Sequence, residues 1–589
     1  MKNKFALKIA LALFAFLLIL SSLTACNNSG EGENIPTDAP TDSGATEGNT
    51  EPSKYSGNSI GESEFIIFDN GSYTCPVIVS ENATDAEKKI YNKLRDKLKS
   101  LTGTLVEFKT DFKAYNDTGD DRSAPAVLIG RTNYDESAEI YKELRFSEGK
   151  IVVKGNKLII AFSDESDGND MYSELLKLIA NSGEQRVALD LSVNLSKISK
   201  PELSELPACT KGVAFAIDCD DDTDMIRVEE AGYDAFVDYK ERLKADGYES
   251  LVAREAGGNL FETFIKGDRY VHIYYKPYND VMRAVVGDVS ALPDYEERAK
   301  SFEKVTTPSL TLVGQSYSDI GLGMIYKLYD GRFVVIDGDA NYGKDLVYKQ
   351  LSKLAGEGND IVVAAWFLTH AHGDHQSGFE ELVEKHPEDV TIENLVYNFA
   401  PESKYKEIAG EENNDLMNDM RELVKTKLAG KTRIIKAHTG QLLSFGGIDF
   451  EILYTPEDFY PAKFDYLNLT SLIVRANIDG TTVLSLADAT HTLGTVLVNS
   501  YGDYLKSDMV QLAHHGIWAS IEKIYEVVDA DVLIWPSNSN GAKQWIEDSS
   551  VRAAIKPAKD IYLPGASNIT IEFPYVFKNN KAEFISNHT

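Results

Sequence analysis

Apolar and polar positions divide the chain into a short apolar start, a polar stretch and three globular segments. Three lysines precede an apolar run at residues 9–20, which is too short to cross a bilayer comfortably. Small residues then lead to Cys26, and this order predicts a secretory signal. Residues 27–60 hold few apolar positions, so they cannot bury enough surface to fold and predict a disordered tether.

Residues 61–200 alternate between helical and strand periodicity. Thr84 and Glu87 have the spacing of a capping box, and apolar residues then recur at helical spacing until Gly103. Short apolar runs, two of them flanking a Gly-Asn turn, predict strands and a hairpin. With the Ile-Gly-Arg-Thr-Asn stretch that ends at Asn133, this order resembles the small α/β accessory domain of hexosaminidases, which implies a packing role.

Residues 210–300 predict a second small α+β domain, with one strand, one helix and three hairpin-like segments. Aromatic residues are frequent here, and they either face a glycan or fill a small core; the core is favoured. His272 lies within Tyr-Val-His-Ile-Tyr-Tyr and has no Cys, His or acidic residue at ligand spacing. We therefore expect it to be an ordinary strand residue.

The segment at residues 306–589 carries the candidate chemistry. A nearly continuous apolar run at 361–368, typical of a strand buried on both faces, leads into Thr-His-Ala-His-Gly-Asp-His. Histidines at alternate positions of an extended chain point the same way, so His370 and His372 can converge on one ion. A turn at Gly373 would direct Asp374 and His375 towards a second ion.

This pattern resembles the metallo-β-lactamase superfamily, whose signature is HxHxDH after a buried strand. The resemblance implies an α/β multidomain protein whose C-terminal αββα sandwich follows two small α+β domains. It further implies that Asp337 braces the metal loop, that Asp488 bridges two metals and that His514 is the last histidine ligand. His515 is an adjacent candidate, but strand neighbours point oppositely, so we expect only one of the two to bind and prefer His514.

One histidine that this family commonly has before the bridging carboxylate is missing. Asn468 and Ser471 stand there instead, in a run that resembles the metallohydrolase domain of bacterial competence DNA-uptake proteins. Water, Asn468 or the substrate then completes one metal position. We expect His438, in a turn-like stretch, to lie at the surface and His491 to lie away from the metals.

The ligand types define the expected cofactor and reaction. Imidazole and carboxylate ligands suit zinc, and manganese or iron are also compatible, as one or two divalent ions. Such ions lower the pKa of coordinated water and supply hydroxide for attack on an ester. In this reaction Asp374 would ligate one ion and orient the nucleophile, while Asp488 holds the ions together. No Gly-x-Ser-x-Gly motif indicates a serine nucleophile.

The leader and the charge indicate where this chemistry takes place. Leu-Thr-Ala-Cys, ending at Cys26, resembles the lipobox of bacterial lipoproteins, which implies an acylated Cys26 and attachment to the cell membrane through lipid alone. A plain secretory signal is the alternative. The chain has 60 Lys and Arg against 92 Asp and Glu, a net charge of −32, which disfavours long nucleic acids. A small or cell-wall-attached substrate is therefore preferred.

Three functions follow from the sequence. The first is an exported, lipid-anchored hydrolase that cleaves a phosphodiester or another ester. The second is an extracellular nuclease of the competence type, although Ile517 after His-His-Gly and the lack of a late histidine before the tail depart from that pattern. The third is a surface glycan- or partner-binding protein with a vestigial metal domain. The sequence leaves open the substrate, the metal, the oligomeric state and any pairing of Cys209 with Cys219.

Overall fold

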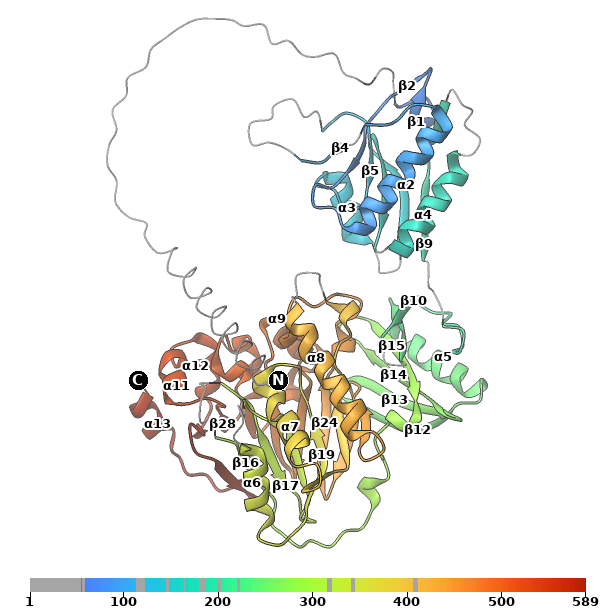
Figure 1. Ribbon diagram of the computed structural model, residues 1–589. Helices are drawn as coiled ribbons and strands as arrows, with labels where there is room; N and C mark the ends of the chain where they lie inside the picture. Colours follow the sequence, from blue (N-terminus) through green and yellow to red (C-terminus); the bar gives the residue numbers. More distant parts are fainter. Residues whose placement is uncertain are drawn as a thin grey trace, which may run out of the picture. The chain divides into compact units, whose positions relative to one another are not determined.

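The computed structural model describes residues 55, 59–107, 109–112, 122–144, 148–163, 165–179, 186–198, 203–219, 223–314, 320–340, 345–405 and 411–588 (Figure 1). The predicted signal with Cys26 and nearly all of the predicted tether lie outside these residues. Among the described helices, none has both the length and the apolar character needed to cross a membrane.

The first folded segment is mixed α/β, as the sequence predicts. Its elements are β1 (Glu64–Asp69), β2 (Ser72–Tyr73), β3 (Val77–Val79), α2 (Asp85–Thr102), β4 (Lys109–Thr110), β5 (Ala126–Ile129), α3 (Asp135–Glu143), β6 (Glu148–Lys154), β7 (Lys157–Phe162), α4 (Glu165–Ile179), β8 (Arg186–Asp190) and β9 (Asn194–Ile198). One sheet has the order β4-β3-β5-β7-β6-β9 and a smaller one the order β2-β1-β8. The predicted capping box is confirmed: Thr84 accepts from the backbone of Glu87, and Glu87 accepts from the backbone of Thr84.

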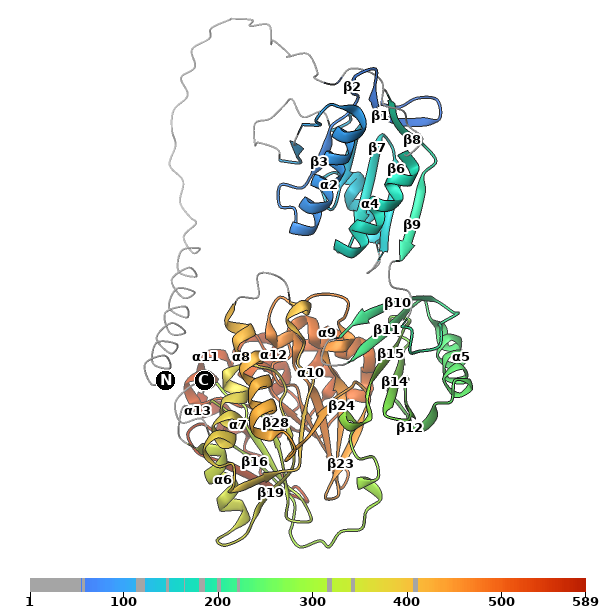
Figure 2. The ribbon, with the colours of Figure 1, turned by 45° about the vertical axis from the view of Figure 1, so that its right-hand side comes forward.

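The middle segment forms an antiparallel sheet with one helix. Its elements are β10 (Val213–Asp218), β11 (Asp224–Glu229), α5 (Gly232–Ala245), β12 (Glu249–Ala256), β13 (Asn259–Lys266), β14 (Arg269–Lys276) and β15 (Val281–Asp288). The strand order is β10-β11-β15-β14-β13-β12, and α5 packs on the face turned away from the C-terminal region (Figures 1 and 2). The expectation that the aromatic residues fill a core is confirmed, since Tyr270 and Tyr274 are fully buried.

The C-terminal region consists of two facing sheets flanked by helices. Its elements are β16 (Ser309–Leu312), β17 (Met324–Lys327), β18 (Phe333–Ile336), α6 (Leu346–Ala355), β19 (Ile361–Phe367), α7 (Gly373–Lys385), β20 (Val390–Ile392), β21 (Asn394–Tyr397), α8 (Glu411–Leu423), β22 (Arg433–Lys436), β23 (Leu442–Phe445), β24 (Ile448–Tyr454), β25 (Ile473–Ile478), β26 (Thr481–Ser485), α9 (His491–Tyr501), β27 (Met509–Gln511), α10 (Glu522–Val528), β28 (Val532–Ile534), α11 (Ser539–Trp545), α12 (Ser549–Ile555), β29 (Asp560–Tyr562), β30 (Ile569–Glu572) and α13 (Lys581–His588).

Three apolar layers hold these two sheets and their helices together. The first sheet has the order β22-β21-β19-β18-β17-β16-β30 and the second β23-β24-β25-β26-β27-β28-β29. One core fills the space between the sheets, a second lies between the first sheet and α6, α7 and α8, and a third between the second sheet and α9, α10 and α12. The result is a helix–sheet–sheet–helix arrangement (Figure 2).

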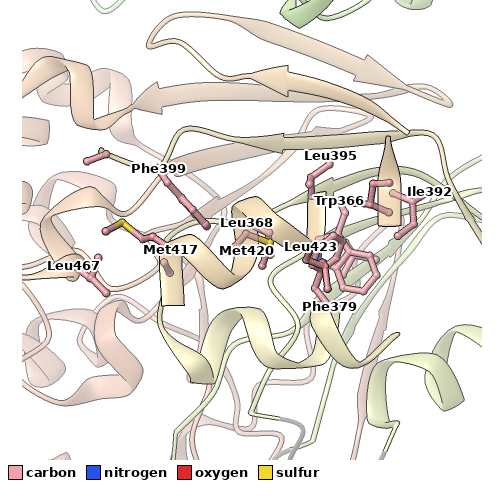
Figure 3. Close-up of a cluster of buried hydrophobic side chains, with 14 of the residues drawn as sticks. Trp366, Leu368, Phe379, Ile392, Leu395, Phe399, Met417, Met420, Leu423 and Leu467 are labelled. Carbon is pink, nitrogen blue, oxygen red and sulfur yellow. The ribbon is translucent and has the colours of Figure 1, made fainter. Parts of the chain in front are cut away.

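Strand β19 and helix α7 place the candidate motif and are fixed by apolar contacts. Trp366 is fully buried and meets Phe379 of α7 edge-on, with ring centroids 5.0 Å apart (Figure 3). Gly338 and Gly378 allow α7 to approach the loop after β18, because a Cβ at Gly378 would lie 1.8 Å from the Gly338 carbonyl oxygen. The start of α7 is therefore held in one position against the sheet.

The middle sheet shares its second face with the C-terminal region. Phe261, Tyr274 and Val285 belong to the same apolar core as α6, α7 and α8. The middle segment is therefore part of one continuous packed unit with the C-terminal sandwich.

Polar contacts between the middle sheet and the sandwich surround His438, which the sequence analysis expected at the surface. That expectation is wrong, because His438 is 0% exposed. Its Nε2 forms a hydrogen bond of 2.5 Å with the hydroxyl of Tyr270. Its other ring nitrogen lies 2.9 Å from Glu457. His272 of β14 stacks on His438 and bonds the Thr439 carbonyl at 2.9 Å. The turn that follows β22 is covered by the middle sheet, which the sequence pattern of the turn does not reveal.

His272 predicts an acid-dependent loss of stability. Burial, together with the nearby charge of His438, lowers the pKa of His272 to about 3. The unfolded chain takes up a proton on this residue below pH ~6.5, whereas the folded chain does not, so stability falls as pH falls through that value. The free energy of unfolding of the wild type should fall between pH 7 and pH 5. In His272→Gln we expect this fall to be smaller by about 2 kcal/mol, as measured by urea denaturation at both pH values.

His491→Gln is the matched control, because His491 is exposed at the start of α9. It should keep the wild-type pH dependence. If the free energy of unfolding depended on pH in the same way in the wild type and in His272→Gln, His272 would not be the source of the acid-dependent loss of stability.

Candidate metal centre

The candidate site lies where five strands end at neighbouring sheet edges. Strands β18 and β19 run parallel, as do β26, β27 and β28, so within each sheet their carboxyl ends point to one edge. The candidate residues follow these ends. Asp337 comes after β18, the HxHxDH motif after β19, Asp488 after β26 and the histidine pair after β27. His372 is the N-cap residue of α7, and Asp374 and His375 lie in its first turn.

Two sets of side chains converge here with donor atoms close enough to share an ion. Asp374, His375, Asp488 and His515 form one set, and within it all ligand atoms lie within 4.8 Å of one another. His370, His372 and Asp488 form the other, on the same criterion. Asp488 belongs to both sets.

The two carboxylate oxygens of Asp488 face different histidines. Oδ1 lies 3.1 Å from Nε2 of His375 and 3.4 Å from Nε2 of His515. Oδ2 lies 3.6 Å from Nε2 of His370 and 3.8 Å from Nε2 of His514. Asp488 is 1% exposed, and its Oδ1 makes no hydrogen bond within the described residues. The nitrogens and the oxygens are therefore directed towards shared points rather than at each other.

The histidine pair does not lie on a strand, so the strand geometry from which we expected only one of the two to bind is wrong. Both residues lie in a short turn, Ala513–Gly516, with φ 49° and ψ 43° at His514 and φ 55° and ψ 14° at His515. This left-handed backbone brings both imidazoles to Asp488. His515 is 1% exposed and belongs to the compact set, whereas the preferred His514 is 26% exposed and lies beside it.

Asp337 holds the loop of the HxHxDH motif in place through hydrogen bonds at both of its ends. It accepts hydrogen bonds from the backbone and the hydroxyl of Thr369, at 2.8 and 2.7 Å. Its Oδ2 also lies 2.8 Å from Nδ1 of His375. Because Nδ1 is engaged by a carboxylate, Nε2 of His375 is left facing the site, as in carboxylate–histidine–metal arrangements. Thr369 was missed in the sequence analysis, although it directly precedes the first histidine of the motif.

His515 is fixed in a similar way by residues that the sequence analysis did not single out. Its Nδ1 lies 3.2 Å from both the Pro536 carbonyl oxygen and the Gly321 amide, and its own carbonyl accepts a 2.7 Å bond from the Trp535 indole. Gly516, at φ 90°, makes room for that indole, because a Cβ there would lie 2.6 Å from Trp535 Nε1. The available signal was the Trp-Pro pair after the apolar run of β28.

Charges in the site balance one another. Burial alone would raise the pKa of Asp488 and lower that of His375, but each holds the other in its charged form: the pKa of Asp488 is well below its usual value and that of His375 well above. The pKa of His515 is raised for the same reason, by Asp488 and Asp374. Burial lowers the pKa of His370 well below its usual value, which favours the neutral imidazole; its Nε2 lies 3.0 Å from Nδ1 of His372.

These residues fit a divalent metal. Buried imidazoles and carboxylates with converging donor atoms, one carboxylate oxygen without a hydrogen bond, and a His375 tautomer fixed by a carboxylate are what a metal of the zinc type requires. A cation would replace the protons that now balance Asp488 and Asp374, which couples its binding to proton release.

The remaining residues of interest belong to neither donor set. Asn468 is buried in a short turn, Leu467–Thr470, and its Oδ1 has no partner within the described residues. His491 is exposed and belongs to neither set. Asp339, which the sequence analysis left out, is 1% exposed, and burial raises its pKa to about 7. Cys75, Cys209 and Cys219 are free thiols.

Comparisons with known proteins give structural likeness only. No family model and no curated protein matches the sequence. The metallo-beta-lactamase fold protein YhfI from Bacillus subtilis is similar over 45% of this chain and 99% of its own, at 13% identity and a TM-score of 0.29. Zn(2+)-bound PqqB from Methylobacterium extorquens gives the same coverage and TM-score at 9% identity. CmlA, a diiron beta-hydroxylase from Streptomyces venezuelae, covers 46% of this chain and 55% of its own, at 13% identity and a TM-score of 0.27.

Structural similarity to a metallo-beta-lactamase fold protein therefore extends over about 45% of the chain. The likeness is one of fold, and the case for metal binding rests on the buried His and Asp residues described above.

Asp488→Asn tests the shared carboxylate. Replacing it with a neutral amide removes the charge that faces both sets of histidines, so we expect zinc affinity to fall by about tenfold or more and bound metal per chain to drop. Isothermal titration calorimetry and elemental analysis of the purified protein measure both quantities.

Asp529→Asn is the matched control. It removes the same charge from a side chain that is 53% exposed and sits at φ 49°, a conformation that Asn tolerates. Unchanged metal content and affinity in Asp488→Asn would contradict a metal site centred on Asp488.

Proposed function

We propose that the protein is an exported, lipid-anchored metal-dependent hydrolase that cleaves a phosphodiester or another ester at the cell envelope. The observation that carries the proposal is the position of Asp488, a buried carboxylate whose two oxygens face separate histidine sets. This arrangement supports binding of two adjacent cations, with zinc as the first candidate and manganese or iron as alternatives.

A bound divalent ion supplies Lewis acidity and ionises water at neutral pH. The chain's own residues provide the geometry. Asp488, three residues after the end of β26, would contribute to both metal positions. Asp374 has a side chain that is 16% exposed, more than the other members of its set, so it is the member that solvent reaches most and would orient the nucleophile. Asp337 keeps Nε2 of His375 directed into the site.

The substrate class is argued from charge. The net charge of −32 opposes the approach of long polyanions, so a small ester or a cell-wall-attached group is favoured over nucleic acid. Electrostatic repulsion of this kind weakens with salt, since charges beyond about 8 Å are screened at physiological ionic strength. The preference therefore concerns long DNA or RNA more than a single phosphodiester.

Hydrolysis of bis(p-nitrophenyl) phosphate tests the activity. We expect metal-dependent release of p-nitrophenol by the full-length protein, abolished by a chelator and restored by zinc or manganese. His372→Ala should reduce kcat/KM by about 100-fold or more, because the set of His370, His372 and Asp488 loses one metal ligand. His491→Ala, an exposed histidine three residues after Asp488, should retain wild-type activity.

The result separates the three functions. Faster cleavage of single-stranded DNA than of small diesters would favour the nuclease. No bound metal and no turnover of phosphodiesters or carboxylic esters would favour a surface binding protein with a vestigial metal domain.

Cys26→Ser tests the proposed anchor. After expression in a bacterial host, the wild type should sediment with the membrane fraction, because acyl chains on Cys26 hold it there. The variant should lose this acylation and move to the soluble or secreted fraction, as followed by immunoblot. Cys209→Ser controls for loss of a cysteine elsewhere and should stay with the membranes. Wild-type protein in the soluble fraction would contradict the anchor.

A further inference from the structure

The two histidine sets around Asp488 are unequal. The set with His375 offers four residues, whereas the set with His370 offers only His370, His372 and Asp488. Tetrahedral metal sites commonly use three protein ligands and an open position, or four. Each set has two imidazoles and shares Asp488, but the His370 set has no second carboxylate to match Asp374, so an additional donor near Oδ2 of Asp488 would complete it.

His514 lies at that oxygen. Its Nε2 is 3.8 Å from Oδ2 of Asp488, close to the 3.6 Å between Oδ2 and Nε2 of His370. Two ligand atoms ~2 Å from one tetrahedral ion lie about 3.3 Å apart. His514 is outside the set of His370, His372 and Asp488, whose ligand atoms lie within 4.8 Å of one another, so its ring would have to turn towards the two histidines to share their ion. The side chain of His514 is 26% exposed, which leaves it free to make that turn.

The backbone around His514 fixes its position relative to Asp488. The amide of His514 donates to the Ala487 carbonyl at 2.9 Å, one residue before Asp488. The amide of Ile517 donates to the His514 carbonyl at 2.7 Å. Because His514 and His515 are both left-handed, their rings diverge on either side of Asp488, with centroids 6.2 Å apart. One ring faces Oδ2 and the other faces Oδ1.

We propose that the adjacent histidines serve different metal positions: His514 completes the position of His370 and His372, and His515 completes that of Asp374 and His375. The proposal rests on metal binding, which the proposed function also requires, but not on the reaction. His514 then takes the place that the sequence analysis assigned to water, Asn468 or the substrate.

Asn468 is the competing donor within the chain. It is buried, and its Oδ1 has no partner in the described part of the structure. An amide oxygen is the weaker ligand for zinc, which prefers imidazole nitrogen and thiolate. Asn468 also lies in a turn held by backbone bonds, with Ser471 N donating to its carbonyl at 3.3 Å.

The test compares zinc binding in four variants of the full-length protein by calorimetry and elemental analysis. His514→Gly removes the ring but keeps a left-handed backbone, which glycine adopts freely. We expect the wild type to bind about two ions, and His514→Gly and His515→Gly each to bind one of them about tenfold or more weakly. The double variant should lose strong binding of both, and His491→Ala should match the wild type.

Double variants show which metal position each histidine serves, because two substitutions at one position should not have additive effects on zinc binding. His514→Gly added to His372→Ala should cause little further loss, because both act on one ion, whereas His515→Gly added to His372→Ala should remove the second ion as well. Wild-type zinc binding in His514→Gly, or equal losses in Asn468→Ala alone, would overturn the proposal. Two ions bound without any hydrolysis would leave it standing and contradict the proposed function instead.

A folding defect is checked independently. Circular dichroism and the urea midpoint of metal-free His514→Gly should match the wild type. If they do not, His514→Asn, which also tolerates positive φ, replaces it in the same comparison.

Discussion

The site depends on one buried carboxylate, that of Asp488, which contacts histidines from loops of both sheets. Asp488 comes from the second sheet, while His370, His372 and His375 come from the first. Their meeting depends on both sheets ending at the same side of the sandwich and on the apolar core that fills the space between them. Without a cation, Asp488 avoids the cost of a buried charge only through the imidazoles around it.

The middle sheet contributes by holding the segment that follows β24. Lys276 pairs with Asp458 at 2.7 Å, with both side chains 2% exposed, and Arg283 donates to the Asp458 carbonyl at 2.7 Å. Arg227 bonds the Tyr460 carbonyl at 3.1 Å. The segment held in this way continues to Asn468. Removing one partner of such a buried pair is strongly destabilising. The buried Lys276–Asp458 pair therefore ties the middle sheet firmly to the C-terminal sandwich.

The sequence predicted those parts of the site that depend on local pattern. The apolar run of β19 and the convergence of His370 with His372 follow from periodicity and spacing, and so does the capping box at Thr84. The predicted turn at Gly373 is instead the start of α7. What the sequence did not predict depends on contacts between distant segments. His438 is buried because the middle sheet covers it. The conformation of His514 and His515 depends on Ala487 and Trp535, which are distant in sequence.

The backbone on both sides of the site is strained, and the surrounding contacts explain why it persists. Ala487, His514 and His515 have φ of 44°, 49° and 55°, a region that costs non-glycine residues about 1–3 kcal/mol each. The Ala487 carbonyl accepts from His514 N at 2.9 Å and from the Gln511 side chain at 3.1 Å, and the Trp535 indole binds the His515 carbonyl. A regular strand would remove this strain but would turn one imidazole away from Asp488. The strained turn is therefore what allows two consecutive residues to face one carboxylate.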